Sequence, residues 1–335
     1  MGMNTEPLAA LIDKAVSARA ALFDARHETA FRLFNGFTEG RPNLAVDLYA
    51  ATILIHNYAD PPAEGYSDVD AARRFLRSRL PWARAMVVKT RNGATSQDKQ
   101  GVLVDGVAAD RRAREHGVWY SIDLLLNRDA SLYLDTRNLR QWALNHLEGK
   151  TALNTFAYTG SLGVAAKAGG ATRVVHLDRN RLFLNVAKTS YTLNGFPIDK
   201  KDFQTGDFWP HIDRLKRAGE RFDCVFVDPP FFAATRKGVV DLERNYTRLI
   251  NKVRPLINDG GYLVAINNAL FVSGADYIKT LDSLCADGYL KIEELIPVPA
   301  DFTGYDQTRV AAPIADPAPF NHSTKIAVIK VRRKT

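Results

Sequence analysis

The spacing of apolar residues changes along this chain of 335 residues. Between residues 5 and 23, apolar side chains recur every three or four positions, which is the period of a helix with one buried face. From Thr29 to Ile55 they alternate with other residues, and glycine and proline separate the runs, which predicts short antiparallel strands. A further helix and two further strands follow. We therefore expect residues 1–115 to form an accessory α+β domain.

The second domain, assigned to residues 116–335, has a different rhythm. Two strand-like runs within 117–134 predict a leading hairpin. Short β-rich runs then alternate with helical ones, which predicts a mostly parallel sheet with helices on both faces. The last two strands, 292–298 and 325–331, have no helix between them, so the last strand should run antiparallel. The predicted fold class is α/β, with a Rossmann-like sheet preceded by a smaller N-terminal domain.

Composition narrows the class of protein. With 46% hydrophobic and 24% charged residues, the chain is neither disordered nor a coiled coil. Its apolar runs are shorter than the roughly 18 residues of a membrane span, and no signal peptide is visible. Two cysteines cannot build a disulfide framework, so we expect a cytoplasmic protein with no membrane partner. The net charge of +8 permits a polyanionic partner.

Candidate site residues follow the parallel strands, because ligands of open α/β sheets bind beyond the carboxyl ends of the strands. A turn after the first strand has Gly160 near its apex, where backbone can approach a ligand closely. Asp178 follows the second strand, 18 residues later, the separation at which a carboxylate accepts both hydroxyls of a ribose. Asp207 and Phe208 follow the third strand and offer a carboxylate and a ring for adenine. Together they predict an adenosine-type ligand.

The fourth strand ends in Asp228-Pro229-Pro230-Phe231-Phe232. Two consecutive prolines fix the backbone and point carbonyls and a carboxylate outward. Phe231 could stack on a ring, so the corner suits methyl transfer to a planar base. The alternative is a purely structural role, in which the segment is a stiff turn with two buried aromatic rings. A dinucleotide-dependent oxidoreductase is disfavoured, because Phe156 and Tyr158 occupy positions where that fingerprint has glycine.

Several stretches taken together carry a family resemblance. They are Leu132–Arg137, Asn154–Gly160, His176–Asp178, Asn194–Gly195, Gly206–Phe208 and Asp228–Phe231 and, more loosely, Arg32–Gly36 and Leu44–Asp47. Over roughly residues 28–335 the chain resembles class I S-adenosylmethionine-dependent methyltransferases, in particular the large-subunit ribosomal RNA methyltransferases of the cytosine-5 and related type. The N-terminal RNA-binding module of many members is not recognisable, and the helix within residues 5–23 stands in its place.

The resemblance implies S-adenosylmethionine as the cofactor and an Asp228, Pro229 and Phe231 corner that orients the acceptor. It places the 156–160 loop at the methionine part, Asp178 at the ribose and Asp207 at the adenine amine. The cofactor-binding set that it implies is Tyr133, Asp135, Arg137, Asn154, Phe156, Ala157, Tyr158, Thr159, Gly160, Asp178, Asp207 and Asp228. Within that set, Tyr133, Asp135 and Arg137 would close over the cofactor.

The cysteines depart from cytosine-5 chemistry, which needs a thiolate to add to carbon 6 of the pyrimidine. Cys224 lies inside a core strand, about 13 Å before its end at ~3.3 Å per residue. Cys285 falls on a late helix. We predict that both are ordinary buried thiols, and that the acceptor is a nitrogen, or a carbon activated by a route that the sequence does not reveal.

Two other features have competing interpretations. A basic run between residues 71 and 91 either contacts phosphates or forms a solvated helix face. Its members are Arg73, Arg74, Arg77, Arg79, Arg84, Lys89 and Arg91. The long loop 297–322, with Asp301, Phe302, Tyr305 and Arg309, is either a lid or an ordered edge loop in which Phe302 and Phe320 fill apolar gaps.

The preferred prediction is a methyltransferase acting on a base in RNA, most plausibly ribosomal. Methylation of DNA adenine or of a small molecule is the nearest alternative. An NAD(P)-dependent oxidoreductase and a non-catalytic RNA-binding protein are alternatives of other classes. The sequence leaves the oligomeric state open, a dimer included.

Overall fold

The computed structural model describes residues 6–235, 238–242 and 246–333. The chain forms two compact units, one of residues Met1–Asp135 with Pro299–Pro313 and one of residues Thr136–Val298 with Ile314–Thr335. Within the described residues, no helix combines the length and the apolar character that crossing a membrane requires.

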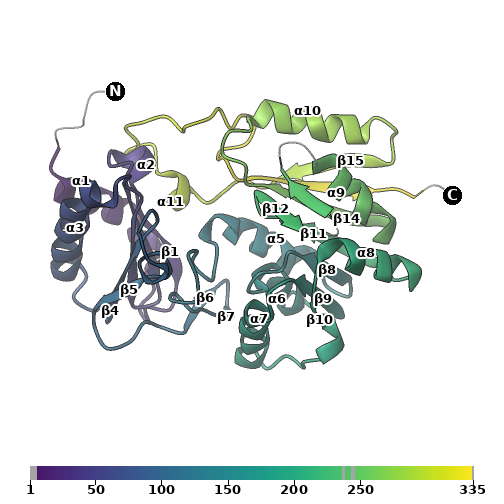
Figure 1. Cartoon of the computed structure of the whole chain (residues 1–335), viewed down its shortest axis with the longest axis horizontal. Coiled ribbons are helices and arrows are strands. Elements are labelled where there is room, and N and C mark those ends of the chain that lie inside the picture. The colour runs from purple at the N-terminus through teal and green to yellow at the C-terminus, as the bar shows by residue number, and fades with distance from the viewer. Residues whose placement is uncertain (1–5, 236–237, 243–245, 334–335) are drawn as a thin grey trace. The chain divides into compact units, whose positions relative to one another are not determined.

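The first unit is built on a five-stranded sheet of order β1-β2-β3-β4-β5, in which only β3 and β4 pair in parallel (Figure 1). The strands are β1 (Ala30–Asn35), β2 (Leu44–Tyr49), β3 (Thr52–Asn57), β4 (Ala85–Thr90) and β5 (Val102–Asp105). The helices and 3-10 turns are α1 (Leu8–Ala18), η1 (Ala20–Leu22), α2 (Gly36–Glu39), η2 (Pro62–Gly65), α3 (Tyr66–Arg79), α4 (Ser96–Gln100) and α11 (Ala300–Thr303). The small α+β arrangement expected from the alternating pattern is therefore present.

Alternate residues of β1 serve two different surroundings. Phe31 and Leu33 pack in the apolar core that α1 and α3 cover. Between them, Arg32 is buried and its Nε lies 2.7 Å from Asp47 Oδ1 on β2. The Arg32 guanidinium also lies 3.8 Å from the ring centroid of Phe302, and its backbone N–H donates to Asp301 at 3.0 Å. These contacts fix residues 299–313 to the first unit.

The long loop 297–322 is thus an ordered connection. Phe302 packs within the first unit, whereas Phe320 packs in the core of the second, with its ring centroid 5.6 Å from that of Tyr277. Asp301 is 1% exposed, and its buried polar groups have partners. Its carbonyl accepts a hydrogen bond from the Arg19 guanidinium, and its carboxylate accepts one from the Arg32 backbone N–H. The structure favours the interpretation of an ordered edge loop, in which Phe320 fills an apolar gap as predicted, whereas Phe302 covers the Arg32 guanidinium instead.

The hairpin expected within residues 117–134 lies elsewhere. β6 (Arg112–Glu115) pairs antiparallel with β7 (Val118–Ser121), and the chain from 122 to 133 forms neither helix nor strand. His116 and Gly117 join the strands with φ values of 50° and 81°. Two consecutive residues with positive φ are the requirement of the tight hairpin turn whose twist matches paired strands. The turn chemistry of His116-Gly117 therefore outweighs the apolar alternation that follows it.

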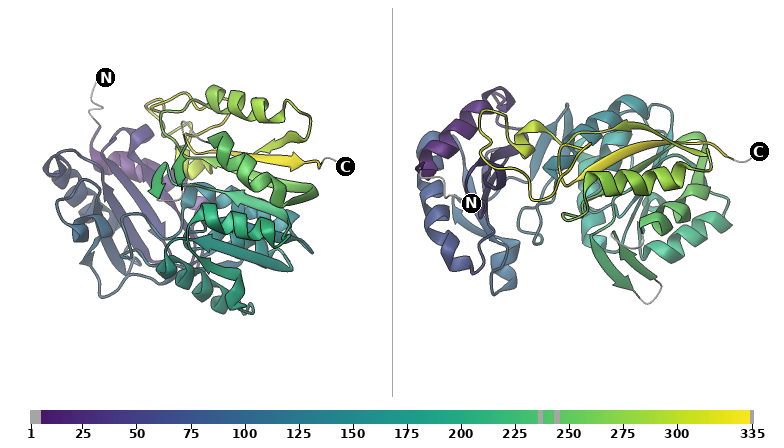
Figure 2. Two further views of the ribbon diagram at one scale, coloured as in Figure 1. Left: turned by 45° about the vertical axis from the view of Figure 1, so that its right-hand side comes forward. Right: turned by 90° about the horizontal axis from the view of Figure 1, so that it is seen from above.

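The second unit contains a seven-stranded sheet of order β10-β9-β8-β11-β14-β16-β15 (Figures 1 and 2). Its strands are β8 (Thr151–Thr155), β9 (Arg173–Asp178), β10 (Phe203–Thr205), β11 (Phe222–Val227), β14 (Ile257–Asn267), β15 (Leu290–Leu295) and β16 (Lys325–Val331). A separate two-stranded sheet consists of β12 (Phe232–Thr235) and β13 (Gly238–Asp241). β16 is antiparallel to both of its neighbours, as the sequence predicts. The other five neighbouring strands, β10, β9, β8, β11 and β14, all run parallel to one another.

Helices cover both faces of this sheet. α8, α9 and α10 bury apolar side chains with Val225 and Leu263 on one face, and α5 and α6 do so with Ala152 and Val264 on the other. The helices and 3-10 turns are η3 (Leu134–Thr136), α5 (Arg137–His146), α6 (Ser161–Ala168), α7 (Arg181–Leu193), η4 (Lys200–Asp202), α8 (Phe208–Arg217), α9 (Tyr246–Val253), η5 (Arg254–Leu256) and α10 (Gly274–Cys285).

His176 on β9 is a core residue. It is fully buried, its Nε2 lies 3.0 Å from the hydroxyl of Tyr191, and its ring stacks on Phe203 with centroids 4.9 Å apart. Burial lowers the pKa of His176 to about 3, whereas an unfolded histidine titrates near 6.5.

A stability prediction follows from this buried histidine. Below pH ~6.5 the unfolded chain binds a proton that the folded chain does not, so the stabilisation is complete above that pH. It declines toward pH 3 by at most about 1.4 kcal/mol per pH unit. We expect His176→Gln to flatten the slope of unfolding free energy against pH, measured by urea unfolding at several pH values. The same substitution at the exposed His146 on α5 is the control, and an unchanged slope in both variants would contradict the assignment.

Candidate functional site

The loop after β8 has an unusual backbone. Phe156, Tyr158 and Gly160 have φ values of 53°, 51° and 78°. The left-handed conformation is unfavourable for bulky residues and, when it is held at a loop between rigid elements, marks a candidate functional site. A Cβ on Gly160 would lie 2.6 Å from Ala187 Cβ, so close packing of this turn against α7 also requires glycine.

Asp178 at the end of β9 ties that loop to the neighbouring strand. Its two carboxylate oxygens accept the backbone N–H groups of Tyr158 and Asn180, both at 2.8 Å. Partial burial raises the pKa of the Asp178 carboxyl above its ordinary value, although these backbone donors oppose the shift. Each oxygen has a second lone pair, so the fixed carboxylate can still accept ligand hydroxyls.

The residues after β10 have roles that the sequence did not predict. Asp207 accepts the backbone N–H of Trp209 at 3.1 Å and thereby caps α8. Phe208 is 4% exposed, and it stacks on Phe156 with ring centroids 4.7 Å apart. Phe208 therefore supports the loop ring from below, and Phe156 is the more accessible of the two.

Beneath the same loop, Asn154 on β8 is 2% exposed. Its Nδ2 is buried with no hydrogen-bond partner within the described residues. An unsatisfied amide donor costs about 1 to 3 kcal/mol when buried, which is a typical sign of a site that binds a polar group.

The corner after β11 presents aromatic rings outward. Phe231 and Phe232 are 48% and 59% exposed, which excludes the alternative of a stiff turn with two buried rings. Pro229 is buried and Asp228 is partly buried. Because β11 lies between β8 and β14, Asp228 stands at the same edge of the sheet as the loop after β8.

Neither cysteine has the environment of a nucleophile at this edge of the sheet. Cys224 is fully buried within β11, and Cys285 ends α10. Burial raises the pKa of each thiol, so both are protonated at neutral pH and poor nucleophiles. Cys224 agrees with the prediction of an ordinary buried thiol, whereas Cys285 is only partly buried.

Three predicted cofactor residues come before the sheet. Tyr133 and Asp135 belong to the first unit, and Arg137 begins α5 in the second. Their predicted role of closing over the cofactor stays a prediction. Within the second unit, the structure brings Asn154, the 156–160 loop, Asp178, Asp207 and Asp228 to the carboxyl edge of four neighbouring strands.

Six of the seven cations of the basic run pair with five carboxylates of their own unit. Arg73 and Arg74 pair with Asp70, Arg77 with Asp105, and Arg79 with Asp13. Arg84 pairs with Asp110 and Arg91 with Asp129, while Lys89 is buried and donates to backbone carbonyls. The structure favours the solvated-face interpretation, since each of these cations already has a partner.

The net positive charge belongs to the second unit. That unit contains 27 Lys and Arg against 18 Asp and Glu, a net charge of +9, whereas the first unit has 18 against 19, a net charge of −1. An attraction for a polyanion therefore originates in the unit that holds the candidate site.

Sequence reasoning missed Asn267, the last residue of β14, next to β11 in the sheet. It is 1% exposed and lines a pocket. Its position directly after the apolar run of residues 262–266 was the available signal.

Comparison with known proteins identifies a family and named relatives that are similar to this chain. Residues 32–311 match the model of an S-adenosylmethionine-dependent methyltransferase family. YwbD of Bacillus subtilis, named as a candidate ribosomal RNA large subunit methyltransferase, is 31% identical over 268 residues, which cover 77% of this chain and 65% of YwbD. Ribosomal RNA large subunit methyltransferase K/L of Colwellia psychrerythraea is 30% identical over 252 residues, which cover 71% of this chain and 34% of that protein. The chain thus spans less than two thirds of either relative.

Among solved structures, SMU.776, a candidate methyltransferase complexed with SAH, has a TM-score of 0.84 and 22% sequence identity, covering 99% of this chain and 83% of that one. The similarity confirms the Rossmann-like methyltransferase fold class.

Proposed function

Because the chain belongs to the S-adenosylmethionine-dependent methyltransferase family, we propose that it methylates a nitrogen atom of a base in large-subunit ribosomal RNA. The family makes S-adenosylmethionine the cofactor and removes the oxidoreductase alternative. The observation that supports a nitrogen acceptor is the place of the two cysteines: Cys224 is fully buried inside β11 and Cys285 ends α10, so neither stands at the corner after β11, where a thiolate would have to add to a pyrimidine.

The residues at the carboxyl edge suit this cofactor. Asp178 offers a fixed carboxylate for two ribose hydroxyls, and Phe156 offers a supported ring. The unsatisfied Nδ2 of Asn154 is a donor for the polar methionine part. Ala157 and Thr159 of the same loop would line the cofactor, and Asp207 would meet the adenine amine.

When bound, S-adenosylmethionine supplies a methyl group on a positively charged sulfur. Transfer needs the acceptor lone pair in line with that carbon, so that the new nitrogen–carbon bond forms as the carbon–sulfur bond breaks and its electron pair returns to sulfur. Asp228 and the Pro229 carbonyl would hold the acceptor N–H groups in this line. The Asp228 carboxylate would also stabilise the positive charge that passes to the nitrogen, until its proton leaves to water.

Ribosomal RNA as the substrate is supported by the names of the relatives and by charge. YwbD and the K/L protein are both named for the large ribosomal subunit. The net charge of +9 on the catalytic unit favours a polyanion over a neutral small molecule.

The experiment that tests the function is mass spectrometry of ribosomal RNA nucleosides from a strain lacking the gene. We expect one methylated nucleoside to disappear from the large subunit and to return when the purified protein acts on that RNA with labelled cofactor. Labelling of DNA or of free nucleosides in preference to RNA would contradict the proposal.

A cysteine prediction separates nitrogen from covalent carbon chemistry. We expect the Cys224→Ser, Cys285→Ser double variant to keep methyl transfer to RNA within about twofold of the wild-type rate, because transfer to nitrogen needs no thiolate. Calorimetric binding of S-adenosylmethionine controls for folding, since a buried serine at position 224 can destabilise the strand. An abolished rate with intact cofactor binding would mean that a cysteine attacks the base.

A further inference from the structure

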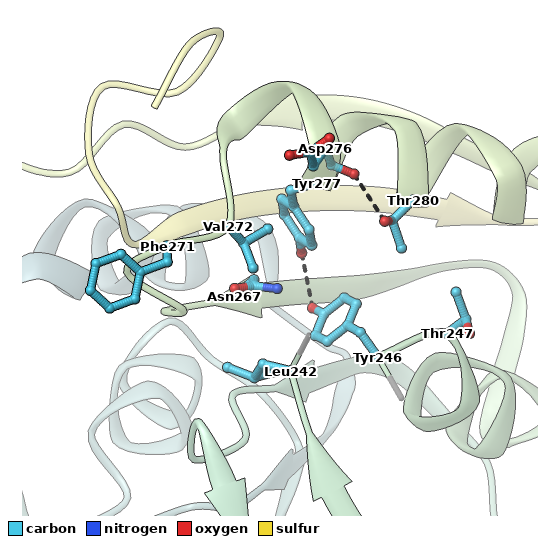
Figure 3. A pocket seen from close by; sticks show the side chains of 9 residues that line it. All are labelled: Leu242, Tyr246, Thr247, Asn267, Phe271, Val272, Asp276, Tyr277 and Thr280. Carbon is cyan, nitrogen blue, oxygen red and sulfur yellow. Dashed lines mark hydrogen bonds between the residues drawn. The ribbon is translucent and has the colours of Figure 1, made fainter. Parts of the chain in front are cut away.

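Two neighbouring helices of the second unit, α8 and α9, carry basic side chains outside their buried faces (Figure 1). α8 begins after Asp207 at the carboxyl edge of the sheet. α9 begins at Tyr246, whose hydroxyl is hydrogen-bonded to Tyr277 and to the carbonyl of Ile266 near the end of β14 (Figure 3). Both helices therefore start at the edge that holds the candidate site. We name these cations the α8–α9 cluster, and they are Lys216, Arg217, Arg248 and Lys252.

Arg248 is exposed, and a buried ring holds its guanidinium in place. Its Cζ lies 4.6 Å from the ring centroid of Trp209, which is 5% exposed and belongs to the core that the two helices cover. Within the described residues, no hydrogen bond or ion pair engages this guanidinium. A cation–π contact orients the guanidinium and leaves its N–H groups unused. Arg248 therefore presents a fork of donors that matches the oxygens of a phosphate.

The cluster has one carboxylate partner among the residues that the structure describes. Lys252 Nζ lies 2.5 Å from Asp213 Oδ1 on α8. The hydrogen bond from Lys252 and the charges of Lys216 and Arg217 lower the pKa of the Asp213 carboxyl, although burial opposes the shift. Partial burial and then the charge of Lys252 lower the pKa of the Lys216 ammonium. The cluster thus holds four cations against one anion, and its members repel one another.

Repulsion of this kind does not stabilise a pair of helices. The basic run of the first unit shows the stabilising arrangement, because six of its cations have carboxylate partners. A local pattern that stability disfavours is typical of a functional site. An anion of another molecule would relieve the repulsion among the cations of the α8–α9 cluster.

The cluster is elongated rather than compact. Arg248 lies beside the start of α8, Lys252 beside its middle, and the other two cations at its end. Residues 209–217 of α8 span about 12 Å at ~1.5 Å per residue. One strand of a nucleic-acid duplex carries a charge per ~3.4 Å of axis, so about three phosphates match this length. A single small anion would occupy only one end of the cluster.

We propose that the α8–α9 cluster binds the sugar–phosphate backbone of the RNA substrate and fixes its register on the catalytic unit. This inference rests on the proposed function and adds the surface that holds the RNA outside the reacting nucleotide. Contacts to phosphate position a nucleic acid without reading its sequence. The cluster therefore supplies affinity and orientation, whereas choice of the base stays with the corner after β11.

The test removes two cations of the cluster that have no ion pair within the described residues. The cluster variant combines Lys216→Gln with Arg248→Gln. The control variant combines Lys279→Gln with Lys291→Gln, which removes the same charge from exposed positions on α10 and β15. The probe is an unmodified transcript of large-subunit ribosomal RNA from the parent organism, and fluorescence anisotropy gives its Kd at several salt concentrations.

We expect the cluster variant to bind this RNA about tenfold more weakly at low salt. The slope of log Kd against log salt concentration should fall by about one to two in magnitude, because fewer phosphates are neutralised. The control variant should keep its Kd for RNA within about twofold of the wild type. In both variants the Kd for S-adenosylmethionine and kcat at saturating RNA should stay within about threefold, since the cluster contacts neither the cofactor nor the acceptor.

Three results would overturn the inference. Equal losses of RNA affinity in both variants would mean that net charge, rather than this surface, attracts the RNA. A cluster variant that loses RNA affinity and urea-unfolding free energy together would mean that these cations hold the helices in place. If the cluster variant binds and methylates RNA like the wild type, the backbone lies elsewhere, although the proposed function survives. The proposed function itself fails only if the wild-type protein methylates no ribosomal RNA.

Discussion

Asp178→Ala is expected to raise the Kd for S-adenosylmethionine by about 5- to 150-fold. The carboxylate is held by two backbone N–H groups at 2.8 Å, so a ligand meets it already oriented. Loss of hydrogen bonds from two ribose hydroxyls to a charged acceptor corresponds to about 1 to 3 kcal/mol. Isothermal titration calorimetry measures the change directly.

The control for Asp178 lies at the opposite edge of the same sheet. Asp202 pairs with Arg173 at 2.8 Å at the amino end of β9, so Asp202→Ala removes a carboxylate and an ion pair without touching the cofactor loop. Its Kd should stay within about twofold of the wild type, since a partly exposed ion pair contributes little. A comparable loss of affinity in both variants would indicate general destabilisation and remove Asp178 from the ribose site.

The sequence was sufficient for elements whose two ends carry local signals. β16 (Lys325–Val331) has the predicted bounds. α6 (Ser161–Ala168) begins after Gly160 and ends before Gly169-Gly170, and β16 contains the apolar run Ile326–Ile329 between Lys325 and Lys330. In such segments the apolar period and the boundary residues predict the same element, so tertiary packing does not change the local preference.

The expected hairpin within residues 117–134 failed because tertiary contacts decide that segment. Ile122 and Leu124 alternate like a strand and are buried, yet the backbone N–H of Asp123 donates to the side chain of Ser131 at 2.6 Å. A side chain that satisfies the backbone removes the need for a paired strand. No local sequence pattern predicts the hydrogen bond between Asp123 and Ser131.

The candidate site shows the same division. The 156–160 loop, Asp178 and Asp228 were predictable because each lies at the carboxyl end of an apolar strand. The Asn267 pocket was not, because its walls come from α9, α10 and the turn after β14, which only the packed unit brings together. The role of Asp207 as a helix cap likewise depends on α8, which the sequence analysis had not placed.

Asp228→Ala is expected to slow methyl transfer by about 100-fold or more, while the Kd for S-adenosylmethionine changes by less than about threefold. Removal of one group that orients the acceptor and stabilises developing charge typically costs this much in kcat. Tyr246 and Tyr277 are hydrogen-bonded to each other, and Tyr246 also donates to the Ile266 carbonyl. Because these hydrogen bonds do not involve Asp228, the packing of the two tyrosines should survive the substitution. Single-turnover transfer to RNA with cofactor bound in advance measures the step.

The matched control is Asp223→Ala on the same strand. Asp223 accepts the N–H of Thr151 at 2.8 Å at the amino end of β11, so it tests for damage to the strand rather than to the corner. It should leave the single-turnover rate within about threefold of the wild type. The contrast with Asp178 is also informative, because a cofactor carboxylate shifts Kd and an acceptor carboxylate shifts the rate. If Asp178→Ala and Asp228→Ala changed both quantities equally, the two carboxylates would not have separate roles.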